Sequence, residues 1–133
     1  MAPTAVRLVV AGERTGKQGV CLQEVVAVIA VGMEVSSEEV EEAVRKISLL
    51  PHVHIKGLMT IAPFVENPEE NRPIFAHLRK LSVDIAKKNI DNITMSILSM
   101  GMTNDYQVAI EEGATMVRVG TGIFGARDYT HQV

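Results

Sequence analysis

From residue 53 onward, short apolar runs alternate with amphipathic stretches, and this alternation constrains the fold more than any other feature. Residues 53–62, 94–98 and 115–119 are rich in apolar and β-branched side chains and predict strands. The stretches between them predict helices that begin near Asn67 and Thr103. Short connections between such elements favour parallel strands covered by helices. We therefore predict an α/β fold, for which an open doubly wound sheet and part of a βα barrel both fit.

Two segments carry explicit signals for the start of a helix. Ser36 followed by Glu39 has the spacing of a capping box, and Pro51 marks the end of the helix that follows. Asn67 followed by Pro68 has the pattern of a capping residue and a first helical residue. Both helices have one apolar stripe, as helices that pack against a sheet require.

The N-terminal region gives weaker signals. Residues 5–10 predict a strand, whereas residues 25–33 fit a buried strand or a buried helix equally well. No repeat or linker divides the chain, so we predict a single domain over residues 1–133. Residues 1–35 are its atypical part.

Composition excludes several classes of partner. Hydrophobic residues make up 47% of the chain, which is typical of a globular protein, and the net charge of -3 argues against nucleic acid. The apolar stretch 25–33 is too short to span a membrane. A single cysteine, Cys21, allows no internal disulfide and favours a cytoplasmic location.

Two segments that follow predicted strands combine glycines with hydroxyl side chains. They are residues 98–105 and 117–125, and ligands of βα folds collect at such strand ends. Backbone amides and hydroxyls here could form a phosphate cradle. The alternative is that the hydroxyls only cap a helix and the glycines only turn the chain. The candidate ligand-binding residues are Ser99, Thr103, Gly120, Thr121 and Gly122.

Arg118 is the most informative single residue. It lies within an apolar strand, and a buried charge without a partner is very costly. Its place near the end of the strand predicts contact with a ligand. The alternative is a structural salt bridge to Asp105 or Glu111.

Other motifs do not support a second kind of site. Gly120, Gly122 and Gly125 match a dinucleotide fingerprint, but too few residues follow for the helix and strand that it requires. His52 and His54 could share one face of a strand, but no third zinc ligand lies nearby. We therefore predict no metal site, and no arrangement of catalytic residues stands out.

Residues 54–64, 98–105 and 112–129 resemble the pyridoxal phosphate homeostasis protein family. The resemblance implies part of a TIM-type (β/α) barrel with parallel strands, like the N-terminal barrel of alanine racemase but incomplete. It also implies binding of pyridoxal 5'-phosphate (PLP) without catalytic turnover. By this resemblance Ser99, Gly120 and Thr121 hold the phosphate, and Arg118 faces the pyridine nitrogen.

The resemblance also implies a Schiff-base lysine on an N-terminal strand, and no lysine of this chain matches that position. The lysines are Lys17, Lys46, Lys56, Lys80, Lys87 and Lys88. We therefore expect a truncated protein with weak, non-covalent binding, in which residues 36–133 are the C-terminal part of the barrel and residues 21–35 an insertion or junction. Two alternatives are a racemase-like enzyme completed by another chain and a non-functional gene fragment. Open sheet edges would favour a homo-oligomer or a complementing chain.

Overall fold

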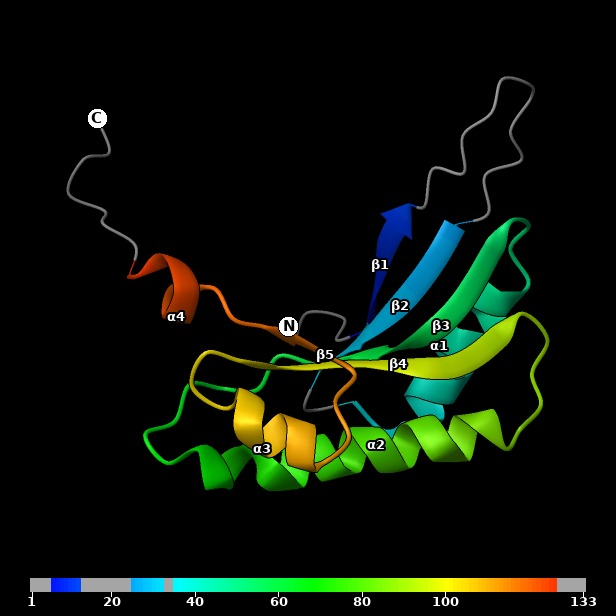
Figure 1. Ribbon diagram of the computed structural model, residues 1–133. Helices are drawn as coiled ribbons and strands as arrows, with labels where there is room; N and C mark the ends of the chain where they lie inside the picture. The colour runs from blue at the N-terminus through cyan, green and yellow to red at the C-terminus, as the bar shows by residue number, and fades with distance from the viewer. Residues whose placement is uncertain (1–5, 13–24, 33–34, 127–133) are drawn as a thin grey trace, which may run out of the picture.

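A computed structural model describes residues 6–12, 25–32 and 35–126 of the chain. They form one five-stranded sheet in the order β1–β2–β3–β4–β5, shown in Figure 1. The strands are β1 (Val6–Gly12), β2 (Val25–Val31), β3 (Val53–Met59), β4 (Ile93–Met102) and β5 (Met116–Arg118). The helices are α1 (Ser37–Ser48), the 3-10 helix η1 (Pro68–Asn71), α2 (Arg72–Ala86), α3 (Tyr106–Glu111) and α4 (Thr121–Phe124).

The parallel sheet predicted from the alternation is confirmed, with one exception at its edge. Strands β2 to β5 pair in parallel, whereas β1 pairs antiparallel with β2. Consecutive strands can pair antiparallel without the long crossover that a parallel pair needs. Because β1 and β5 are the two edges, the described strands do not close into a barrel.

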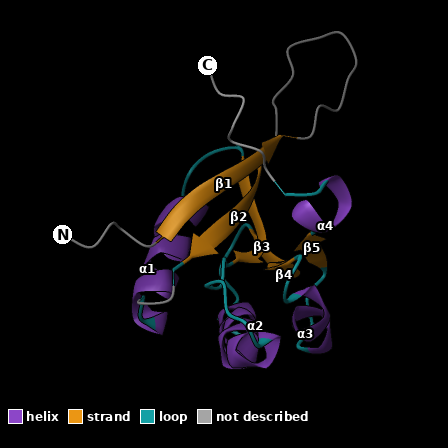
Figure 2. Cartoon of the chain, turned by 90° about the vertical axis from the view of Figure 1, so that its left-hand side faces the viewer, coloured by secondary structure: helices purple, strands orange, loops and turns teal. Residues whose placement is uncertain are grey.

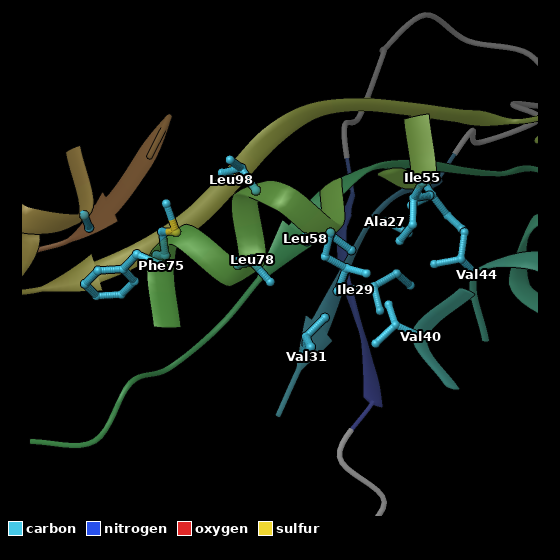
Figure 3. Packing of buried hydrophobic residues seen from close by; sticks show 14 of the residues in the cluster. Ala27, Ile29, Val31, Val40, Val44, Ile55, Leu58, Phe75, Leu78 and Leu98 are labelled. Carbon is cyan, nitrogen blue, oxygen red and sulfur yellow. The ribbon is translucent and has the colours of Figure 1, made fainter. Parts of the chain in front are cut away.

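Helices α1, α2 and α3 lie on one face of the sheet, and α4 lies apart from them beyond β5 (Figures 1 and 2). The core fills the layer between this face and the helices, as Figure 3 shows. Its largest fully buried side chains include Phe75 of α2, Ile29 of β2 and Leu58 of β3. No helix in the described part is long and apolar enough to cross a membrane.

Strand β2 resolves the ambiguity of residues 25–33. This segment is a strand, and Ala27, Ile29 and Val31 are buried in the same core as α1 and α2. Part of the segment that resembled a junction is thus integral to the sheet. Lys17 and Cys21 lie outside the described residues.

The predicted capping box of α1 is confirmed. The Ser36 hydroxyl accepts a hydrogen bond from the Glu39 amide at 3.2 Å, and the Glu39 carboxylate accepts one from the Ser36 amide at 3.1 Å. These contacts give partners to two amides at the start of the helix.

Replacing Ser36 by alanine is expected to lower the free energy of unfolding by about 1 kcal/mol, because the Glu39 amide loses its acceptor. Chemical denaturation of the variant would measure the change. Ser37→Ala is the matched control, since Ser37 is exposed and follows the capping position. Equal losses in both variants would contradict a capping role for Ser36.

Two other helix starts differ in detail from the prediction. The Asn67 side chain accepts from the Glu69 amide at 3.1 Å, as predicted, but the first turn is the 3-10 helix η1 and α2 begins only at Arg72. The helix expected to begin at Thr103 begins at Tyr106. The Thr103 hydroxyl has other partners, which bring two loops together.

Arg72 connects the start of α2 to the end of α3. Its guanidinium donates to the carboxylates of Glu69, Glu111 and Glu112. These hydrogen bonds raise the pKa of Arg72 above its usual value. The contacts fix α3, and therefore the loop between β4 and α3, against the helical layer.

Candidate functional site

A cavity of about 1160 Å³ lies at the C-terminal ends of β3, β4 and β5. The two loops that the sequence singled out both contribute to it. A third segment, residues 61–64 after β3, completes the lining. The described lining residues are Ile61, Ala62, Pro63, Phe64, Met102, Thr103, Asn104, Asp105, Arg118, Val119, Gly120, Thr121, Phe124 and Gly125.

The structure brings together most of the predicted site residues. Thr103, Arg118, Gly120 and Thr121 line the cavity. Gly122 lies next to it and contacts Thr103. Ser99 is buried and lies outside the lining, in the part of β4 that pairs with β3 and β5.

Thr103 joins the loop after β4 to the loop after β5. Its hydroxyl oxygen accepts hydrogen bonds from the Thr121 hydroxyl at 3.1 Å and from the Gly122 amide at 3.0 Å. A Cβ atom at Gly122 would lie 2.9 Å from the Thr103 methyl carbon and 3.0 Å from Val119 Cγ1. Glycine at position 122 therefore allows this close packing of the loops.

The amides of Gly120 and Thr121 remain available at the cavity. In the described part of the chain, neither amide has a protein acceptor, whereas the following amide is bonded to Thr103. Gly120 has no atom within 4 Å of the position where a Cβ would stand. A ligand can therefore approach this segment of backbone closely.

Arg118 extends from β5 to the segment after β3. Its Nη2 atom donates to the Thr60 carbonyl oxygen at 2.7 Å, while its Nε atom is buried and has no acceptor among the described residues. Burial lowers the pKa of the guanidinium, and the negative charge of Asp105 opposes this effect. Arg118 forms no salt bridge within the described part, so the structural alternative to ligand contact is not observed.

A buried pair, Asn71 and Asp105, ties the loops of the site together. The Asp105 carboxylate accepts from the Met102 amide at 2.7 Å and from Asn71 Nδ2 at 2.9 Å. Asn71 Nδ2 also donates to the Pro63 carbonyl oxygen at 2.9 Å. Sequence reasoning missed this pair because its members lie far apart in the chain. Their positions at the end of η1 and just before α3 gave no local signal.

Apolar side chains form much of the cavity rim. Phe64 and Phe124 are 85% and 86% exposed, and Ile61 and Met102 are also exposed. No lysine occurs among the described lining residues. The site thus combines an apolar rim with free amides, hydroxyls and one guanidinium, which suits a small aromatic ligand that carries an anion.

Within residues 6–12, 25–32 and 35–126, no group of three His, Cys, Asp or Glu side chains could hold a metal ion. His54 of β3 instead contacts the Thr94 hydroxyl of β4 through Nε2 at 3.0 Å. This contact lies at the opposite end of the strands from the cavity.

Comparison with known families gives one match over most of the chain. Residues 19–128 match the family model described as the alanine racemase N-terminal domain. The chain is 44% identical over 113 residues to the pyridoxal phosphate homeostasis protein of Aquifex aeolicus, covering 81% of this chain and 49% of that protein. It is 38% identical over 110 residues to the protein of the same name from Pseudomonas aeruginosa, covering 83% and 45%. The chain thus spans about half the length of the curated relatives that it matches.

Solved structures agree with this result. PipY of Synechococcus elongatus with PLP bound superposes with a TM-score of 0.64 at 29% identity, covering 75% of this chain and 50% of PipY. PipY without PLP gives a TM-score of 0.60 at 34% identity, covering 68% and 41%. The architecture is therefore shared with a protein that has been solved with PLP.

Proposed function

Because this chain belongs to the alanine racemase N-terminal domain family, we propose that it binds PLP non-covalently in the cavity at the ends of β3, β4 and β5. One observation carries the proposal. The loops after β4 and β5, joined by Thr103, place free amides and the Arg118 guanidinium around one cavity.

The cavity offers different groups to the two ends of the cofactor. We assign the phosphate to the Gly120 and Thr121 amides, since oriented amides bind anions well, and to the Thr121 hydroxyl, whose proton would turn from Thr103 to the phosphate. Thr103 and Gly122 hold this loop in place. For Ser99, the family resemblance alone supports a phosphate contact, because its side chain is buried outside the lining.

We assign Arg118 to the pyridine nitrogen. A guanidinium stays protonated and only donates, so a nitrogen that accepts from it stays unprotonated. Such a ring is a weaker electron sink, which suits carrying the cofactor better than carbanion chemistry. We therefore propose cofactor homeostasis, without catalytic turnover and in the cytoplasm, as the role of this chain. The PLP-bound structure of PipY and the names of the curated relatives support it.

Titration with PLP tests the proposal, with binding followed by absorbance and by the rise in melting temperature. We expect saturable binding that borohydride does not make permanent, because no lysine lines the described cavity. Pyridoxal without its phosphate should bind at least about tenfold more weakly, since charge-assisted hydrogen bonds are lost.

Thr121→Val should weaken PLP binding by roughly tenfold, because it removes the hydroxyl that can turn its proton from Thr103 to the phosphate. Thr94→Val is the matched control, since Thr94 lies at the opposite end of β4 and contacts His54 instead. Permanent capture of PLP by borohydride at one lysine would contradict non-covalent binding. Equal affinity for pyridoxal and PLP would contradict the assigned phosphate site.

A further inference from the structure

Asp105 and Arg118 are the two charged residues among the described lining residues of the cavity. Their charges are opposite, so this lining carries no net formal charge. A cavity that binds a phosphate usually gains affinity from excess positive charge. The described lining lacks that excess, although Arg118 is present.

The Asp105 carboxylate is fixed in place. Its side chain accepts from both the Met102 amide and Asn71 Nδ2, and Asp105 is only 6% exposed. It therefore cannot turn toward solvent without breaking two hydrogen bonds. The Thr60 carbonyl oxygen holds the Arg118 guanidinium in a similar way.

Asp105 and Arg118 line the same cavity, so the carboxylate can influence the guanidinium through its charge without direct contact. No salt bridge joins the two residues, yet the carboxylate opposes the effect of burial on the Arg118 pKa. The guanidinium thus keeps its N–H donors while the carboxylate offsets part of its attraction for anions.

We propose that Asp105 is a specificity-determining residue that offsets the charge of Arg118, so that Arg118 favours a neutral ring nitrogen over a small free anion. This inference deepens the proposed function and rests on it for the identity of the ring. Without the carboxylate, the lining would carry one net positive charge. Arg118 would then attract inorganic phosphate, which competes with the phosphorylated cofactor.

The test is the affinity for inorganic phosphate of the wild-type chain and of Asp105→Asn, measured by titration calorimetry at low salt. We expect Asp105→Asn to bind inorganic phosphate roughly three- to tenfold more tightly, because one opposing charge is gone. The variant should also melt at a lower temperature, because its amide nitrogen cannot accept the bond that one Asp105 oxygen accepts from Met102 or Asn71. The gain should shrink as salt is added, since salt screens charges in an open cavity. The preference for PLP over inorganic phosphate should fall.

Three further variants separate charge from structure. Asp105→Glu keeps the charge and should show no gain. Asp84→Asn removes an equal charge from an exposed position on α2 outside the cavity lining and should show no gain. In the double variant Asp105→Asn with Arg118→Met, the gain should disappear, because Arg118 supplies the attraction.

The outcomes distinguish this inference from the proposed function. If the wild-type chain binds PLP but Asp105→Asn binds inorganic phosphate no more tightly than the wild type, the inference is overturned and the proposed function stands. If Asp105→Asn gains phosphate affinity but the wild-type chain does not bind PLP, the proposed function is overturned and only the charge offset between Asp105 and Arg118 stands. Weaker binding of both ligands by an Asp105→Asn variant that remains folded would show that Asp105 only positions the loop. If Asp105→Asn does not fold, Asp105→Ser replaces it in every arm.

Discussion

Phe75→Ala is expected to lower the free energy of unfolding by about 3–5 kcal/mol, the range found for removal of a buried aromatic side chain. Phe75 is 0% exposed and lies in the layer between α2 and the sheet (Figure 3). The loss combines the transfer of the ring to water with the cavity that it leaves. Since small domains are stable by only about 5–15 kcal/mol, this change alone removes a large part of the margin.

Urea denaturation followed by far-ultraviolet circular dichroism would measure the effect. Phe124→Ala is the matched control, because it removes the same ring from a position that is 86% exposed. We expect its free energy of unfolding to change by less than about 0.5 kcal/mol. Similar losses in the two variants would contradict the buried position of Phe75.

The elements that the sequence predicted correctly depend on local signals. The capping box at Ser36 and the Asn67 cap were identified from residues a few positions apart, and both contacts are confirmed. The α/β class and its parallel strands followed from alternation alone. The resemblance to pyridoxal phosphate homeostasis proteins is confirmed by the curated relatives.

The features that could not be predicted depend on contacts between distant segments. Nothing near β1 indicated that it would pair antiparallel, because the direction of pairing depends on the connection between strands. Periodicity could not decide between strand and helix for β2, which is buried in the core. Thr103 was expected to start a helix, yet its hydroxyl bonds to the loop after β5.

The candidate site also combines features that local sequence signals predicted with contacts that they did not. The sequence identified the two loops through their glycines and hydroxyls, and the structure places both at one cavity. It did not identify the contact between Asn71 and Asp105, which joins residues that are 34 positions apart. It also could not decide whether Arg118 binds a ligand or an internal carboxylate. The assignment of individual site residues to PLP stays a prediction until binding is measured.

Arg118→Met is expected to reduce the affinity for PLP by roughly 10- to 100-fold, because a hydrogen bond from a charged donor contributes about 1.5–3 kcal/mol. Methionine has a similar length and fills the space of the side chain, but it cannot donate to the ring nitrogen. Titration of the variant with PLP, followed by absorbance, would measure the loss.

Stability should respond differently from binding in the same variant. The substitution removes the bond to the Thr60 carbonyl oxygen but also removes a buried Nε atom that has no acceptor in the described part. Loss of the hydrogen bond destabilises the fold, whereas loss of a buried charged group stabilises it, because burial disfavours the charged guanidinium. The free energy of unfolding should therefore change by less than about 1 kcal/mol.

Two controls make the result specific to the site. Arg79→Met removes an arginine from an exposed position on α2 that does not line the cavity, and PLP affinity should stay unchanged. Arg118→Lys keeps the charge but loses the planar set of donors, so it should recover only part of the affinity. If Arg118→Met binds PLP with full affinity, Arg118 does not contact the cofactor. A large loss in the free energy of unfolding would show that the main role of Arg118 is its internal contacts.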